Sequence, residues 1–393
     1  MSEARIDRIT NENNTAGPII SGITTFSGQN FFVPPKGTTA QRPSNCPPGS
    51  IRFNTDSAKL EYFDNLQWLE LEAFNVEIGI STNAAGTSGG LGTRGVFGGG
   101  YTPTTTNVID FVTITTLGNA IDFGDLASSV GGNSACSSST RGLFYGGNGA
   151  PAGNTNITFI TLSSTGNTTS FGSLTYGSFR FHSSCSSSTR GLTGGGQGFP
   201  AYVYKNNIEY VTIASTGSSV DFGDLLGAPN GGASLSSSTR GIWTGGYNNP
   251  GSEVIGFITI STLGNALNFG NLTVPRYFVS GCSSSTRGVF GGGVYPSPVG
   301  TLNTIDYITI ASAGNAQDFG DLTVYCYSNA SCSSPTRGVW AGGYVPSTPT
   351  NANNVIGYIN ITTTGNAQDF GDLSGSFTTR GYFSACSNGH GGL

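Results

Sequence analysis

The order of apolar and polar positions along this chain follows the two-residue period of strands and not the period of a helix. Short segments such as 305–310 (IDYITI) are bounded by stretches rich in Gly, Ser and Asn. Thr, Ser, Ile, Val, Phe and Tyr dominate between the glycines, and these residues favour short strands and turns. The pattern predicts an all-β fold.

Two blocks of this pattern recur down most of the chain. One resembles 282–293 (CSSSTRGVFGGG), and its arginine recurs every 47 to 50 residues. The other resembles segment 305–310, followed by Gly-Asn and then by 318–322 (DFGDL). A repeat of this length without helical periodicity predicts a β-propeller. The repeated arginines are Arg94, Arg141, Arg190, Arg240, Arg287 and Arg337.

Each repeat contains four predicted strands, A to D. Strand A is the small-residue segment before the arginine, strand B follows the arginine, strand C is the IDYITI type and strand D the DFGDL type. Small residues suit the inner position, where blades converge. The first repeat lacks strand A, and segment 382–387 (YFSACS) supplies a surplus one. We therefore predict a six-bladed β-propeller over residues 81–393, closed without an open edge by its C-terminal strand.

Residues 1–80 lack the repeat. Their proline pairs, at 34–35 and 47–48, predict an extended arm. Segments 49–56, 60–65 and 68–71 alternate and are broken by Asn- and Asp-rich turns, which predicts a three-stranded β-meander. Such a sheet is small, so we expect it to serve as an attachment module that packs on the propeller or on other proteins.

Composition removes several classes of function. The net charge is −5 with 16 Lys plus Arg, and no basic cluster occurs, so we expect no nucleic-acid partner. No apolar run is long enough for a membrane helix, and the polar start is not typical of a signal peptide, so we expect no membrane insertion. Five cysteines share one place in the repeat and are predicted to be buried and reduced. They are Cys136, Cys185, Cys282, Cys332 and Cys386.

The chain offers little catalytic chemistry. The carboxylates of the DFGDL segments are replaced by Ser or Asn in two repeats, so we interpret them as side chains that accept backbone hydrogen bonds in turns. We interpret the six arginines as hydrogen-bond forks onto a neighbouring turn, with an anion-binding ring as the alternative. Two histidines are too few for a metal site of their own. We therefore predict no enzyme activity, no catalytic residues, no metal and no cofactor.

The two faces of the predicted propeller differ in sequence. The A–B and C–D turns repeat almost unchanged, whereas the B–C and D–A loops change in every repeat and carry Tyr, Phe, Asn and Pro. Such side chains on loops with a rigid base are typical of surfaces that recognise sugars or proteins. The candidate ligand-binding residues are Phe181, Phe199, Tyr202, Tyr204, Tyr247, Tyr277, Tyr295, Tyr327 and Tyr344. The alternative is that these loops only pack on one another.

The pattern GSIRFNTD, LEYFD and then Trp, over about residues 37–72, resembles a short module found near the ends of phage tail-fibre and other virion proteins. Together with the DFGDL repeat, the whole chain resembles virion structural proteins of marine cyanobacterial myoviruses. The glycine pairs that follow strand B resemble kelch repeats in part, although Phe319 stands where a kelch blade has Trp. These resemblances imply a particle component, assembled in the host cytoplasm and carried on the tail or another external surface.

The expected function is therefore that of a tail, fibre or baseplate component. Its N-terminal module would bind other virion proteins, and its variable loops would contact a host-surface glycan or protein. The alternative is a docking or decoration protein that binds only other particle proteins. A polysaccharide-cleaving spike is disfavoured because it needs two placed carboxylates. The resemblance also leaves a homo-oligomer open.

Overall fold

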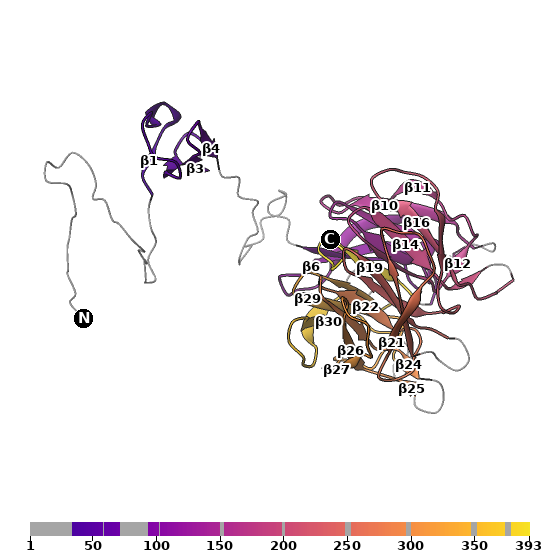
Figure 1. The fold of residues 1–393 in the computed structure, drawn as a ribbon. Coiled ribbons are helices and arrows are strands. Elements are labelled where there is room, and N and C mark those ends of the chain that lie inside the picture. Colours follow the sequence, from indigo (N-terminus) through magenta and orange to yellow (C-terminus); the bar gives the residue numbers. More distant parts are fainter. Residues whose placement is uncertain are drawn as a thin grey trace, which may run out of the picture. The chain divides into compact units, whose positions relative to one another are not determined.

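The structure, a computed structural model, describes residues 34–57, 59–70, 93–101, 103–149, 153–198, 201–247, 253–295, 300–346, 352–373 and 379–393. Within these ranges the chain forms β-strands and a three-residue 3-10 helix, η1 (Thr39–Gln41), which confirms the all-β class. None of the described helices has the length and apolar character needed to cross a bilayer. The chain divides into two compact units, Met1–Asn75 and Val76–Leu393 (Figure 1).

The described part of the larger unit contains six four-stranded antiparallel sheets, which we number 1 to 6 along the chain. Sheet 1 contains β32 (Ser384–Ser387), β5 (Arg94–Gly98), β6 (Thr106–Thr113) and β7 (Ile121–Val130). Sheet 2 contains β8 (Ser134–Ser137), β9 (Arg141–Tyr145), β10 (Asn156–Thr161) and β11 (Thr169–Ser173). Sheet 3 contains β13 (Ser183–Ser186), β14 (Arg190–Gly194), β16 (Asn207–Thr212) and β17 (Val220–Asp224).

The remaining three sheets have the same strand order. Sheet 4 contains β18 (Gly232–Ser236), β19 (Arg240–Gly245), β20 (Val254–Thr259) and β21 (Leu267–Asn271). Sheet 5 contains β22 (Ser280–Ser283), β23 (Arg287–Gly291), β26 (Thr304–Thr309) and β27 (Gln317–Asp321). Sheet 6 contains β28 (Ala330–Ser333), β29 (Arg337–Ala341), β30 (Val355–Asn360) and β31 (Gln368–Asp372). Two short ribbons, β12 (Phe179–Arg180) with β15 (Gln197–Gly198) and β24 (Val294–Tyr295) with β25 (Gly300–Thr301), lie in the loops.

The first strand of sheet 1 comes from the far end of the chain. β32 pairs antiparallel with β5, and Cys386 lies opposite Val96. This confirms the prediction that the C-terminal segment completes the first sheet. The repeated four-stranded sheets and this closing strand are consistent with the blades of a β-propeller.

The first strands of the six sheets pack side by side in a closed order, β8, β13, β18, β22, β28, β32 and back to β8. One serine of each strand donates its hydroxyl hydrogen bond to the backbone oxygen of the equivalent serine in the preceding strand, at 2.6–2.8 Å. A larger side chain would not fit in this buried circle. The serines are Ser137, Ser186, Ser236, Ser283, Ser333 and Ser387.

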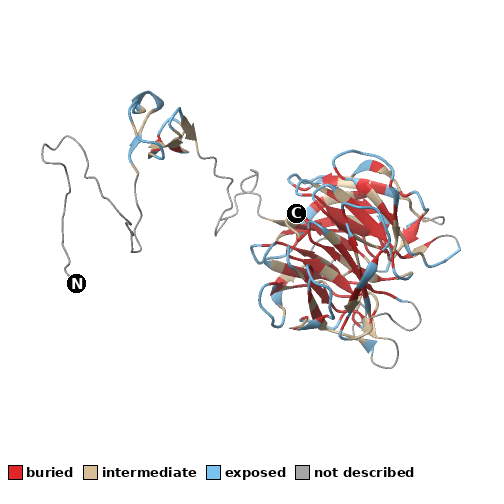
Figure 2. Ribbon diagram, in the orientation of Figure 1, coloured by how far each residue is buried: buried red, intermediate tan, exposed pale blue. Residues whose placement is uncertain are grey.

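Buried residues lie along the strands of the larger unit (Figure 2), and apolar side chains of successive sheets pack into shared clusters. Between sheets 6 and 1, for example, Phe97 and Ile114 pack with Val339 and Phe370. Burial of one such phenylalanine stabilises the fold by roughly 1.5–3 kcal/mol. The cysteines of the repeat lie in these clusters and are buried and free, as predicted.

The glycine pairs after the second strand have positive φ angles. Gly99 and Gly100 have φ of 75° and 121°, and Gly292 and Gly293 have φ of 73° and 107°. A Cβ on Gly99 would lie 2.8 Å from the backbone oxygen of Val130. These positions therefore require glycine for both conformation and space.

The repeated arginines donate hydrogen bonds to the neighbouring sheet. This confirms the interpretation that they act as hydrogen-bond forks. Each guanidinium donates a hydrogen bond of 2.8–3.0 Å to a backbone oxygen that follows the third strand of the next sheet. Arg337 of sheet 6 donates to Ile114 of sheet 1, which closes the circle. Each guanidinium also lies 4.5–4.9 Å from the centre of an aromatic ring on the third strand. We call this side of the unit the repetitive face.

The repeated carboxylates lie in the fourth strands, as the assignment of strand D predicted, so the interpretation that they accept backbone hydrogen bonds in turns was wrong. Asp122 is exposed on β7, and Asp318 is exposed on β27. The backbone hydrogen bonds are accepted instead by asparagines of the Gly-Asn turns, as when Asn167 Oδ1 accepts from the Asp125 amide of the preceding sheet at 2.9 Å. An asparagine beside glycine can reach across to the neighbouring sheet, whereas Asp122 and Asp318 lie on the solvent side of the outermost strands. The carboxylates in question are Asp122, Asp125, Asp221, Asp224, Asp318, Asp321, Asp369 and Asp372.

The described part of the smaller unit is one sheet of four strands. β2 (Ile51–Asn54), β3 (Lys59–Phe63) and β4 (Trp68–Glu70) form the predicted meander. β1 (Lys36–Gly37) adds a fourth, parallel strand to β2, where we had expected an extended arm. Two residues carry no alternating pattern that would reveal a strand.

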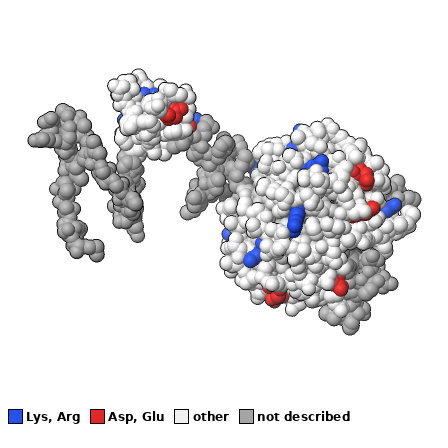
Figure 3. All heavy atoms as spheres, viewed as in Figure 1, with Lys and Arg blue, Asp and Glu red and all other residues white. Residues whose placement is uncertain are grey.

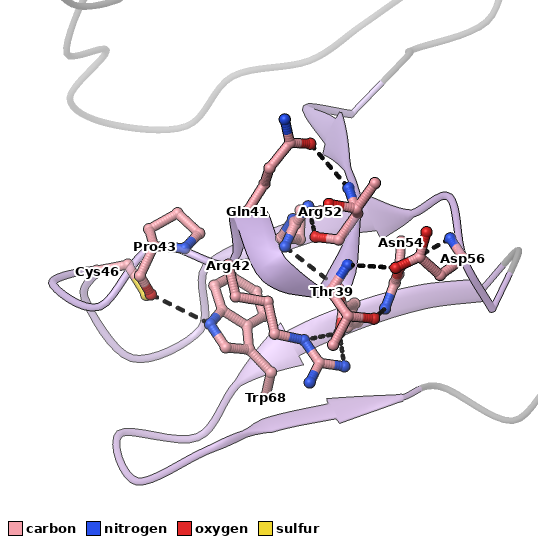
Figure 4. Close-up of polar contacts among 11 residues, drawn as sticks. Thr39, Gln41, Arg42, Pro43, Cys46, Arg52, Asn54, Asp56 and Trp68 are labelled. Atoms are coloured by element: carbon pink, nitrogen blue, oxygen red, sulfur yellow. Dashed lines mark hydrogen bonds and ion pairs between the residues drawn. The ribbon is translucent and has the colours of Figure 1, made fainter.

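One face of this small sheet is polar and is covered by residues 38–43 (Figure 4). Glu61 is fully buried there and pairs with Arg42 at 2.6 Å and with Arg52 at 3.5 Å. Asn54 Nδ2 donates to Thr39 Oγ1 at 3.0 Å. The polar residues therefore form the interior of this unit.

The opposite face of the small sheet is apolar. By strand alternation and register it carries Ile51, Phe53, Leu60, Tyr62 and Leu69. Ile51 is 54% exposed and Leu60 is 39% exposed. Within the described residues, this unit exposes Ile51 and Leu60 and buries Glu61 with Arg52, whereas the Lys59–Glu70 ion pair is partly exposed.

Candidate functional site

The face opposite the arginines is formed by the loops between the second and third strands and by those between successive sheets; we call it the variable face. At its centre, six equivalent residues surround the axis of the unit. The backbone amide of each donates to the carbonyl of the one before, at 2.5–2.9 Å, in a closed circle. We call this circle the mouth. Its residues are Gly132, Phe181, Gly231, Phe278, Ser328 and Tyr382.

All six residues of the mouth have a left-handed backbone, with φ between 54° and 71°. Glycine adopts this conformation freely, but for a bulky side chain it is an outlier. Phe181 (φ 58°), Phe278 (φ 54°) and Tyr382 (φ 56°) are such outliers. The closed circle of hydrogen bonds holds these residues in an unfavourable conformation.

Large and small residues alternate around the mouth. The aromatic residues come before the first strands of sheets 3, 5 and 1, and the small ones come before those of sheets 2, 4 and 6. A Cβ on Gly132 would lie 2.9 Å from the ring of Phe181, and one on Gly231 would meet the ring of Phe278. Each glycine of the mouth therefore makes room for the next aromatic ring.

The three aromatic rings of the mouth touch one another. The ring centres of Phe181 and Tyr382 are 4.9 Å apart, and those of Phe278 and each of the other two rings are 5.3 Å apart. These are the distances of favourable aromatic pairs. All three rings are half-buried, so part of each remains open to solvent.

The aromatic surface continues outward from the mouth in two directions. Tyr327 and Tyr344 stack at 5.5 Å, and Tyr344 lies 5.0 Å from Tyr382. On the other side, Tyr277 lies 5.3 Å from Phe278 and 5.2 Å from Tyr247, which is 6.3 Å from Tyr204. We call these eight residues the aromatic cluster. They are Phe181, Tyr204, Tyr247, Tyr277, Phe278, Tyr327, Tyr344 and Tyr382.

A cation lies beside the cluster. The guanidinium of Arg180 is 5.0 Å from the ring centre of Phe181 and 5.3 Å from that of Tyr202. Its Nε and Nη2 donate to Gln197 Oε1 at 2.9 and 2.7 Å. Tyr202 thus belongs to the same region through Arg180.

Six of the nine predicted site residues therefore belong to the aromatic cluster, and Tyr202 lies at its edge. Tyr295 lies on β24 and has no ring contact within the described part of the chain. Phe199 lies outside the described residues. Phe278 and Tyr382, which complete the mouth, were not among the predicted residues. The signal that identifies them is their position, four residues before the repeat cysteine, which they share with Phe181.

A small cavity lies below the mouth. It has a volume of about 120 Å³ and is lined by Ser184, Ser234, Gly281, Ser331 and Ala385, among others. A second cavity of about 50 Å³ lies at the level of the serine circle. The C-terminal tail closes the far end.

His390 holds that tail in place. Its Nε2 donates to the backbone oxygen of Ser137 at 2.8 Å, and its Nδ1 accepts from the Gly392 amide at 3.0 Å. The Gly391 amide donates to Ser283 at 2.9 Å. Burial lowers the pKa of His390, so the imidazole is neutral near pH 7, as these two hydrogen bonds require.

Two buried ion pairs support the loops of the variable face. Arg380 and Asp110 are 2.6 Å apart in sheet 1, and Arg276 and Asp306 are 3.1 Å apart in sheet 5. All four side chains are almost fully buried. Burial raises the pKa of Asp110 to about 6, while Arg380 acts in the opposite direction.

In sheet 3 the equivalent acid, Glu209, accepts the backbone amides of Thr175 and Tyr176 at 2.9 and 2.7 Å. The sheets that supply aromatic rings to the mouth are thus the sheets that carry a buried acid.

Charged side chains are sparse on the visible surface of the larger unit and do not gather into a patch (Figure 3). No three His, Cys, Asp or Glu side chains among the described residues come together as a metal site would need. Comparison with known protein families and with curated proteins finds no match to this chain.

Proposed function

We propose that the larger unit is a six-bladed, kelch-like β-propeller, and that the chain is a non-enzymatic structural protein of a phage virion. In this proposal it is a tail, fibre or baseplate component that presents the variable face to the host surface or to a surface glycan. The resemblance of residues 37–72 to a virion module and the closed circles of contacts between six sheets support this reading.

The aromatic cluster is the main support for the proposal that the variable face contacts the host. Eight rings from the loops of five sheets form a connected series of ring contacts, and Tyr204 and Tyr247 are exposed. Tyr and Phe offer large, rigid contact area with little loss of conformational entropy, which suits them to recognition. The chain enters sheet 1 at Arg94 and leaves it at Ser387, both at the repetitive face.

The apolar face of the small sheet favours the second candidate, a protein that docks on other particle proteins. The apolar side chains of this face are Ile51 and Leu60, which are exposed, and Phe53, Tyr62 and Leu69, which are half-buried; other proteins cover surfaces of this kind. This surface also fits the attachment role of the N-terminal unit in the first proposal. The two candidates therefore differ only in what the variable face does.

Binding of the full chain, fluorescently labelled, to cyanobacterial cells tests the proposal. We expect saturable binding that falls at least tenfold in a Tyr204→Ser/Tyr247→Ser variant and is unchanged in Leu117→Ser, whose exposed side chain lies at the repetitive face. Binding to fibre-depleted particles without binding to cells would favour the docking protein. Release of reducing sugar from host polysaccharide would contradict the non-enzymatic role.

A further inference from the structure

The aromatic residues of the mouth are not required by its backbone. Phe181, Phe278 and Tyr382 have positive φ, whereas Gly132 and Gly231 occupy equivalent positions without strain. Glycine at all six positions would allow the same circle of hydrogen bonds. Strained residues of this kind are found where a functional requirement keeps them.

Core packing does not account for these rings either. Between the sheets, Phe222 and Phe290 are 2% and 0% exposed. The rings of Phe181, Phe278 and Tyr382 are only half-buried and lie at the surface of the variable face. Their open parts join the rings of Tyr327 and Tyr344 to form a continuous aromatic surface over the axis.

The surroundings of the three rings select the chemistry of a ligand. The described charged partner of these rings is Arg180, which stacks on Phe181 and already donates two hydrogen bonds to Gln197. The acids beneath the loops, Asp110 and Asp306, are paired and buried. A ligand that fits is uncharged, has a flat C–H face to lie on the rings, and has hydroxyls to bond with tyrosines at the edge.

We infer that Phe181, Phe278 and Tyr382 form a stacking platform for an uncharged hexopyranose unit of a surface glycan. This inference rests on the proposed contact role of the variable face and names the ligand and the place where it binds. The cavity below is small, about 120 Å³, and the open parts of the three rings lie at the variable face. The sugar therefore binds on the outer side of the rings.

Saturation-transfer NMR on the full chain tests the platform with methyl glucoside, methyl galactoside and methyl mannoside, and with glucuronic acid as the charged comparison. We expect transfer to at least one methyl glycoside and weaker transfer to glucuronic acid. Phe278→Gly should reduce the transfer at least fivefold. Because glycine suits the backbone at this position, the variant should remain folded, with a melting temperature within a few degrees of wild type.

Two controls separate the platform from the rest of the cluster. Ser328→Gly changes a small residue of the mouth and should leave the transfer unchanged. Leu117→Ser changes an exposed residue of the repetitive face and should also leave the transfer unchanged. Tyr204→Ser changes the outer end of the cluster and should reduce the transfer less than Phe278→Gly does.

Each other outcome overturns the inference in a recognisable way. If Tyr204→Ser abolishes transfer and Phe278→Gly does not, the sugar binds at the outer loops. If no glycoside receives saturation while the chain still binds cells, the ligand is a protein or a charged glycan and the contact role survives. If neither sugars nor cells are bound, the proposed function fails as well.

Discussion

The repetitive and variable faces of the larger unit are built by opposite ends of the same strands. On the repetitive face, one arginine from each sheet makes the same side-chain contact with the next sheet, six times in a closed circle. On the variable face only the backbone repeats six times, and the side chains of the mouth alternate between large and small. Sheet-to-sheet contacts that do not depend on the loop side chains leave those side chains free to serve recognition.

The largest effect is expected from removal of β32 together with Tyr382, because the serine circle and the mouth each lose one member. Deletion of residues 381–393 takes away β32, the Ser387 link of the serine circle and Tyr382 of the mouth. It leaves β5 as an open edge. We expect an aggregated product or one without cooperative thermal unfolding, measured by circular dichroism.

Deletion of residues 388–393 is the matched control, since it keeps β32. This variant should fold and melt cooperatively at a lower temperature because it loses the tail that closes the axis. An unchanged melting temperature after the longer deletion would contradict ring closure.

The next test concerns an ion pair that supports the variable face. Asp110→Asn leaves Arg380 buried without its counter-charge, which should destabilise the protein by about 3–5 kcal/mol in urea unfolding. Asp122→Asn, an exposed acid on the adjacent strand, should change stability by less than about 0.5 kcal/mol. A similar loss in both variants would show that the pair has no special role.

Acidification should lower the free energy of unfolding by a smaller amount, because His182 is buried in its neutral form. His182 is 5% exposed, and burial lowers its pKa to about 4, against about 6.5 in the unfolded chain. The folded state thus binds this proton less readily. The contribution of neutral His182 to the free energy of unfolding is therefore full above pH 6.5. It falls by about 3 kcal/mol as the pH falls to 4.

A His182→Asn variant isolates this effect. Asp110, whose pKa is raised, titrates in the opposite direction in both proteins and cancels in their difference. Urea unfolding of wild type and variant between pH 7 and 4 should therefore give stabilities that converge as the pH falls. Parallel curves would rule out His182 as the source.

Repetition explains how much of the fold the sequence could predict. Six copies of one block expose the role of each position, so the four strands, the small inner residues, the reduced cysteines and the closing segment 382–387 could all be predicted. β1 could not be predicted, because its two residues carry no pattern. The hydrogen-bond role of the carboxylates was wrongly predicted because their replacement by Ser and Asn fits an exposed strand position as well as a turn.

The candidate site could be predicted only in part. The sequence identified the variable loops and most of the aromatic cluster, because Tyr and Phe gather there. It did not select Phe278 and Tyr382, because a positive φ at bulky residues goes against local propensity and depends on the closed circle of backbone hydrogen bonds. Nor does sequence pattern indicate that Arg276 would reach Asp306, since this pair depends on the path of one loop.

The smallest effect provides the most direct comparison of the two faces. Replacing any one repeated arginine with Ala removes a hydrogen bond to the next sheet and a cation–π contact, as for Arg190 with Ile260 and Tyr210. We expect a loss of about 1–2 kcal/mol in urea unfolding, similar at all six positions. Tyr204→Ser, on the variable face, should change stability by less than about 0.5 kcal/mol.

Cell binding should show the reverse order. The arginine variants should bind as wild type does while they remain folded, and the Tyr204→Ser/Tyr247→Ser variant should not. Unequal losses among the six arginines would mean that the repetitive face is not six copies of one contact. A stability loss in Tyr204→Ser equal to that of Arg190→Ala would mean that the variable loops hold the sheets together, and their side chains would then not be free for recognition.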